Sequence, residues 1–231
     1  MSKKKSRTTK QLFIDSKDPT AFTCAYQQLD AIIAMLGHVD ANGKLHSKIH
    51  FPTSDKEVLE SVERVIRQVM TLAINQHDVA QFRKAYVALE RILGIDMENY
   101  EGLEVHCPAE GITINTSPAE ACLAYKAWPV VAEVFKLSLA HPGPALRQGI
   151  DTPIQLILCF EVWLNSPELQ SDVAEITQVA NEAVFLFLSE VKPIAQAQGV
   201  DLKLYIQGLV FLKRFPILEQ IFWTQHAALS V

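Results

Sequence analysis

The chain has 231 residues, 49% of them hydrophobic and 20% charged, and a formal net charge of −5 at pH 7. This length and composition support a substantial buried core and exclude disordered and fibrous proteins. The cysteines form no Cys-x-x-Cys pair, which argues against a zinc knuckle, a redox pair or a disulfide scaffold. We expect buried, reduced thiols at the four positions Cys24, Cys107, Cys122 and Cys159.

The sequence predicts neither export nor a membrane span. The basic segment MSKKKSRTTK is followed by QLFIDSKDPT, where a secretory signal would need an apolar run. The most apolar segment, residues 153–165, spans 13 residues and contains Glu161, whereas a spanning helix needs about 20 apolar residues. We therefore expect a cytoplasmic protein without membrane contact.

The first half of the chain is predicted to be helical with one short hairpin. Apolar positions at helical spacing predict a first helix over residues 19–36. The segment HVDANGKLHSKIHF alternates in polarity around Asn42–Gly43, a pair typical of tight turns, and predicts a hairpin with a basic outer face. A capping box at Ser54–Glu57 and a capping pattern at Asp78–Gln81 predict two antiparallel helices, the second ending at Gly94.

The second half is predicted to contain the larger share of the helices. The alternating segment GLEVHCPAEGITIN predicts a second small hairpin. Ser117 and Glu120 predict a capped helix that continues to residue 139 with a kink at Pro129. Further helices are expected from about residue 153, from about 167 to 191 with a short extension to 199, and on both sides of Pro216. The predicted fold is mainly α, a bundle of roughly eight helices with one or two short β-hairpins.

Charge divides the chain near residue 100. Residues 1–100 contain 14 Lys and Arg and 12 Asp and Glu, a net of +2, whereas residues 101–231 contain 7 and 14, a net of −7; the two sum to −5. We expect a basic tail at 1–17, an N-terminal helical region with a short hairpin at 18–100, and an apolar C-terminal helical core at 101–231. One continuous domain is the alternative, because helix bundles often bury an inserted hairpin between helices.

The dipeptide His77–Asp78 is the strongest candidate for chemistry. Such a pair is typical of some metal-dependent phosphohydrolases, so this enzyme class is the alternative interpretation. Asp78, however, follows a polar break and precedes an apolar helical face, where an aspartate caps the helix. The sequence also lacks phosphate-binding loops, nucleophile elbows and His-Glu-x-x-His motifs. We therefore predict a non-enzymatic protein with no metal site and no cofactor.

Basic residues near the N-terminus predict contact with nucleic acid. A run of cations attracts phosphate backbones through counterion release, without sequence specificity. Arg64, Arg67, Arg83, Lys84 and Arg91 would have to extend this surface into a patch. A solvated tail and a hairpin edge blunted by lysine are the alternatives. The predicted nucleic-acid-binding residues are Lys3, Lys4, Lys5, Arg7, Lys10, Lys44 and Lys48.

The C-terminal half predicts a protein partner. The segments AVFLFLSEV, GLVFLKRF and ILEQIFW are apolar on more than one helical side. Each segment lies deep in the bundle, offers surface to a partner, or lines an apolar cavity. The predicted function is that of a binding or scaffold protein, which docks a protein partner or a second copy of itself through this half.

Overall fold

The computed structural model describes residues 19–39, 45–47, 56–95, 97, 100–107, 112–139, 151–201 and 215–230. The predicted mainly α fold with short β-hairpins is confirmed within these ranges. None of the described helices has the length and hydropathy needed to cross a membrane. The elements in chain order are α1 (Pro19–Leu36), β1 (Gly37–Val39), β2 (Leu45–Ser47), α2 (Lys56–Asn75), α3 (Val79–Val87), η1 (Ala88–Ile92), β3 (Leu103–Cys107), β4 (Ile112–Thr116), α4 (Pro118–Ala124), α5 (Trp128–Leu139), α6 (Asp151–Leu164), η2 (Pro167–Asp172), α7 (Val173–Ala197) and α9 (Pro216–Ala228).

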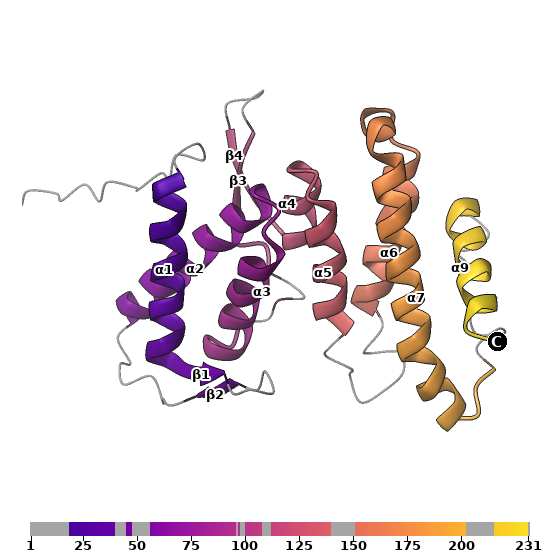
Figure 1. The fold of residues 1–231 in the computed structure, drawn as a ribbon, viewed down its shortest axis with the longest axis horizontal. Coiled ribbons are helices and arrows are strands. Elements are labelled where there is room, and N and C mark those ends of the chain that lie inside the picture. Colours follow the sequence, from indigo (N-terminus) through magenta and orange to yellow (C-terminus); the bar gives the residue numbers. More distant parts are fainter. Residues whose placement is uncertain are drawn as a thin grey trace, which may run out of the picture.

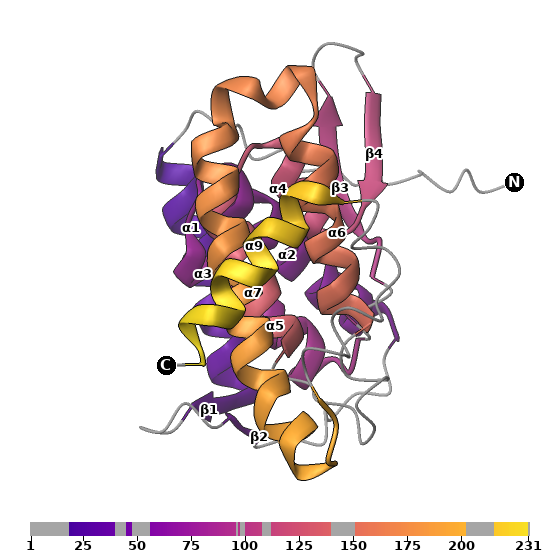
Figure 2. The ribbon, with the colours of Figure 1, turned by 90° about the vertical axis from the view of Figure 1, so that its right-hand side faces the viewer.

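The helices stack in a row that follows the order of the chain, from α1 at one end to α9 at the other (Figure 1). Each helix packs mainly against helices close to it in sequence, as α2 does against α1 and α3, and α7 against α5, α6 and α9. Helices α3, α5 and α7 lie side by side, and α9 crosses α7 on one face of the molecule (Figure 2). Such a row is stabilised mainly by contacts between neighbouring helices, so it has a large surface area for the size of its core.

One continuous hydrophobic cluster extends from Ala25 in α1 to Phe222 in α9. Aromatic rings join the later helices within this cluster. The ring centroids of Trp163 in α6 and Trp128 in α5 are 5.7 Å apart. Phe187 of α7 and Phe222 of α9 meet edge to face, with 6.1 Å between their ring centroids. Each fully buried side chain of this size contributes about 1.5–3 kcal/mol to folding. The core therefore continues through the whole row.

Two predicted helix caps are confirmed. The Asp78 side chain accepts a hydrogen bond from the Gln81 amide at 3.1 Å and caps α3. Ser117 and Glu120 form a complete capping box at the start of α4. The predicted cap at Ser54 and the helix predicted before Pro216 lie outside the described residues.

The single helix predicted from Ser117 to residue 139 is wrong, because the chain turns at residues 125–127. Pro129 is the second residue of α5, where its missing N–H removes no helical hydrogen bond, so it starts a helix and does not kink one. The long helix expected from residue 167 begins with the 3₁₀ turn η2, and the short extension expected after residue 191 is continuous with α7, which passes Pro193 and ends at Ala197.

Both predicted hairpins are present. In the first, His38 of β1 lies opposite His46 of β2, and its turn is outside the described residues. In the second, β3 and β4 pair from Leu103↔Thr116 to Cys107↔Ile112 without interruption. Strand β3 packs against α2 and α4, and the two strands extend above α1 and α4 in Figure 1 and lie at the side of the molecule in Figure 2.

Candidate interaction surface

His77 and Asp78 form the turn between α2 and α3. While Asp78 caps α3, His77 adopts a left-handed backbone conformation with φ 57°. Its ring Nε2 lies 3.1 Å from the carbonyl oxygen of Tyr125, in the turn between α4 and α5. Among the described residues, no group of three or more His, Cys, Asp or Glu side chains could hold a metal ion. In this structure the dipeptide therefore joins two helical hairpins.

The turn between α4 and α5 repeats this geometry at Lys126, whose φ is 51°. The amide that follows each left-handed residue bonds to the carbonyl five residues earlier: Asp78 to Ala73 at 2.8 Å, and Ala127 to Cys122 at 2.8 Å. This pattern is the Schellman motif, in which glycine usually takes the left-handed position. The Lys126 side chain reaches Asp172, just before α7, at 2.9 Å. Each turn thus contacts the next one along the row.

Ion pairs connect the helices that form one outer layer. Lys84 of α3 pairs with Asp30 of α1 at 2.9 Å, and Lys136 of α5 pairs with Glu182 of α7 at 2.7 Å. All four of these side chains are well exposed, so each pair contributes little stability. The pair between α3 and α5 is different, because one of its members is buried.

Arg83 of α3 binds Glu133 of α5 with both ends of its guanidinium group. Its Nε donates to Oε1 at 2.5 Å and its Nη2 donates to Oε2 at 2.9 Å. The Glu133 side chain is only 4% exposed, while that of Arg83 is 58% exposed. Hydrogen bonding to Glu133 raises the pKa of Arg83, so the guanidinium group stays charged at neutral pH.

Three of the cations on α2 and α3 that would have to extend a basic patch lie close to acidic side chains. Arg67 lies 3.7 Å from Glu63 and donates to the Gly102 carbonyl, and Arg83 and Lys84 are held by Glu133 and Asp30. Carboxylates therefore offset three of the charges that were to extend the patch. The predicted nucleic-acid-binding residues Lys3, Lys4, Lys5, Arg7, Lys10, Lys44 and Lys48 all lie outside the described residues.

The prediction that the cysteines are buried is wrong for Cys24. This residue lies exposed on α1, where its sulfur accepts a hydrogen bond from Gln28. Cys122 is fully buried, and burial raises the pKa of its thiol, so it is a packing residue and not a nucleophile. Cys24 lies on the face of α1 that points away from the other helices. The spacing of apolar residues in the sequence did not reveal this orientation.

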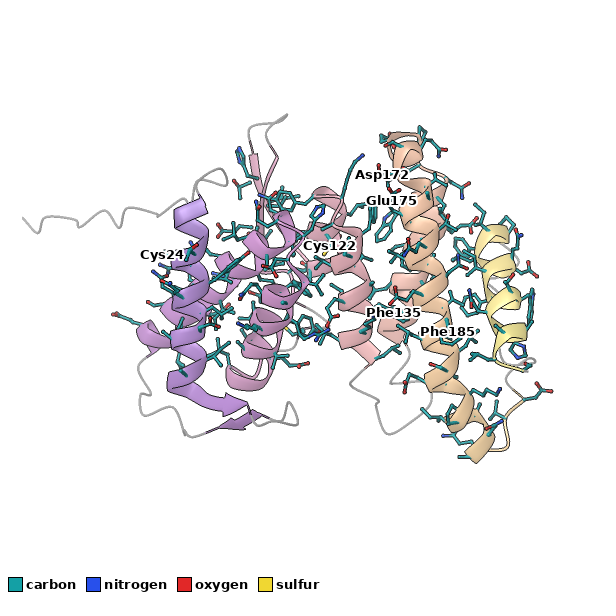
Figure 3. All side chains as sticks on the ribbon, viewed as in Figure 1. Cys24, Cys122, Phe135, Asp172, Glu175 and Phe185 are labelled. Atoms are coloured by element: carbon teal, nitrogen blue, oxygen red, sulfur yellow. The ribbon has the colours of Figure 1, made fainter. Side chains whose placement is uncertain are left out.

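Phe185 on α7 is an exposed aromatic ring beside the outer ion pairs. Its ring is 40% exposed, although its neighbours Val184 and Phe187 are fully buried. Glu182, which pairs with Lys136 of α5, precedes it by one helical turn. Figure 3 shows Phe185 and Phe135 at the same level of α7 and α5, with Asp172 and Glu175 near the start of α7.

Two further large hydrophobic side chains are exposed among the described residues, Val162 of α6 at 62% and Ile114 of β4 at 42%.

Comparisons with protein-family models, with curated proteins and with solved structures found no match for this chain.

Proposed function

We propose that this chain is a non-enzymatic scaffold that binds a protein partner on the outer face of α5 and α7, around Phe185. The observation that carries the proposal is the exposed ring of Phe185 beside a charged pair. Interfaces commonly have an aromatic anchor at the centre and polar groups at the rim. Phe185 would be such an anchor, and Lys136 and Glu182 would lie at its rim.

Covering Phe185 would supply a useful share of binding energy. A phenylalanine side chain presents about 200 Å² of surface, so the 40% exposure leaves roughly 80 Å² in water. At about 25 cal/mol per Å², burying this surface contributes about 2 kcal/mol, or about 30-fold in Kd. This is the size of effect expected from one hot-spot residue.

The surroundings of Phe185 favour rigid presentation of this surface. Its helix is tied to α5 through Glu182 and Lys136, and to α9 through a hydrogen bond between Asn181 and Gln225 at 3.1 Å. The buried packing of α7 against α5, α6 and α9 holds the helix in place more than this exposed ion pair does, so little conformational entropy is lost when a partner docks. A rigid face with an exposed ring suits a scaffold.

Site-specific photo-crosslinking tests the proposal. A photoreactive phenylalanine analogue placed at Phe185 in cells should give a discrete crosslinked product, whereas the same analogue at the more exposed Val162 should not. Binding of the captured partner to purified chain should then weaken about 30-fold in Phe185→Ala and stay unchanged in Val162→Ala. Equal crosslinking at both positions, or equal affinities of both variants, contradicts the proposal.

Nucleic-acid contact is a second part of the proposal, confined to the basic N-terminal residues. It is supported by the five cations among residues 1–10, which precede any acidic residue. Because phosphate contacts release counterions, affinity for mixed DNA and RNA should fall steeply with salt and drop when residues 1–10 are removed. Absence of binding at low salt contradicts this part and leaves the scaffold proposal intact.

The alternative, a metal-dependent phosphohydrolase, has a direct test at Asp78. Asparagine caps a helix nearly as well as aspartate but is a much poorer metal ligand. The scaffold proposal expects Asp78→Asn to keep its stability within about 0.5 kcal/mol, with no change in metal content by elemental analysis. A stoichiometric transition metal that is lost in this variant would favour the enzyme.

A further inference from the structure

The outer edge of β4 is unpaired within the described part of the chain. Strand β3 packs against α2 and α4 and pairs with β4, whereas β4 pairs with β3 alone. Thr113, Ile114 and Asn115 are all exposed, although successive residues of a strand point to opposite faces. The middle of β4 therefore stands clear of the helices on both faces, as the projecting hairpin in Figures 1 and 2 shows.

Among the described residues, this edge lacks the features that usually prevent strands from pairing. Edge strands are commonly protected by lysine, by proline, by a bulge or by a covering element. Strand β4 reads Ile-Thr-Ile-Asn-Thr, with no charged residue and no proline. Its five consecutive residue pairs with β3 contain no bulge. Its β-branched residues also favour the extended conformation that a second strand requires.

We propose that β4 binds the β4 strand of a second copy of this chain, antiparallel and edge to edge, so that two hairpins form one four-stranded sheet. The two-fold axis passes through Ile114, which meets Ile114 of the other copy. Thr113 then lies opposite Asn115, and the ends of the strand lie opposite each other. This surface is separate from the face around Phe185, so the proposal stands independently of the scaffold function.

Charge favours a second copy over another extended segment. Self-pairing places no like charges opposite each other, because β4 is neutral. The nearest exposed acid on the sheet, Glu104, lies on β3 opposite Asn115. Three strand spacings of about 4.8 Å and an offset of two residues along the strand, about 7 Å, separate it from its symmetry mate by about 16 Å, beyond the screening length of about 8 Å at physiological salt. A charged peptide would find no complementary charge on β4.

The contact is small, so the dimer should be weak. Two five-residue strands bury less than the roughly 1,200 Å² found in stable interfaces. Association should therefore depend strongly on concentration. Sedimentation velocity of the full chain between about 10 μM and about 1 mM should show a reversible shift from monomer to dimer.

Charge variants at the two-fold axis test the geometry. Ile114→Lys places two cations opposite each other and should weaken dimerisation at least about tenfold. Val162→Lys is the matched control, because it makes the same change at a more exposed apolar residue on α6. Mixing Ile114→Lys with Ile114→Glu should restore a dimer that contains one of each, which also shows that the variant hairpins are folded.

Three outcomes would overturn the proposal. The wild-type chain could stay monomeric throughout the concentration range. Val162→Lys could weaken the dimer as much as Ile114→Lys does. The mixture of the two Ile114 variants could fail to dimerise. None of these outcomes depends on whether Phe185 binds a partner, so the two surfaces are tested separately.

Discussion

The bidentate pair between Arg83 and Glu133 should be the most consequential polar contact between the outer helices. In Arg83→Met the side chain keeps its aliphatic length but loses both hydrogen bonds to Glu133. The carboxylate is 4% exposed, so it is left in a poorly hydrated site without its partner. We expect this substitution to lower the free energy of unfolding because an uncompensated buried charge remains.

The magnitude follows from the exposure of the two side chains. Removing one member of a fully buried pair costs about 3–5 kcal/mol. Arg83 is 58% exposed, so water can enter the space it vacates and reach the carboxylate from one side. This partial hydration reduces the expected cost to about 2–3 kcal/mol. Urea unfolding followed by far-UV circular dichroism, with an unchanged m value, measures it.

Lys84 supplies the matched control, since it lies next to Arg83 and pairs with an exposed acid, Asp30. Lys84→Met should cost no more than about 0.5 kcal/mol. The double variant Arg83→Met with Glu133→Leu should return to within about 1 kcal/mol of the wild type, because no buried charge is left. If Arg83→Met costs no more than Lys84→Met, Glu133 does not need its partner and the reasoning is refuted.

Three further predictions concern other buried or strained groups. His77→Ala should cost about 1 kcal/mol, because it keeps a Cβ at positive φ and loses the bond to the next turn, whereas His77→Gly should be near neutral in the same unfolding assay. Glu161→Ala removes the buried carboxylate that accepts a hydrogen bond from the Leu218 amide in the first turn of α9. It should lower the free energy of unfolding by about 2–3 kcal/mol and speed amide exchange in α9, whereas the control Glu219→Ala should lower it by about 0.5 kcal/mol. Burial raises the pKa of Tyr26 and of Tyr100 to about 12, so stability should fall between pH 10 and pH 12, where the unfolded chain ionises first; phenolate absorbance should show both groups titrating late.

Local signals in the sequence predicted the elements whose cause is local. The caps at Asp78 and Ser117 depend on residues three positions away, and the structure has both. The hairpin from Leu103 to Thr116 depends on the alternation of apolar and polar residues on either side of a turn. In the structure its two strands pair antiparallel. In each case the interacting groups lie within one turn or one hairpin, so the sequence contains the whole interaction.

The sequence did not reveal features that depend on distant partners. Arg83 and Glu133 are 50 positions apart, and Glu161 reaches the Leu218 amide from 57 positions away. The apolar segment around Phe185 left open whether its helix is buried, offers surface to a partner or lines a cavity, and it did not show which ring would remain exposed. The rotation of a helix about its own axis decides which side chains face solvent. In this row of helices that rotation is set by the neighbouring helices, whose positions follow only from the fold.

The contacts of His77 and Lys126 explain why these two turns have a long polar side chain at a left-handed position where glycine would be less strained. A non-glycine residue in this conformation costs about 1–2 kcal/mol. His77 and Lys126 offset this strain, because His77 reaches the carbonyl of Tyr125 and Lys126 reaches Asp172. Glycine would relieve the strain but could make neither contact. Successive turns are therefore linked from α2 to α7, through the contact of His77 with Tyr125 and the contact of Lys126 with Asp172.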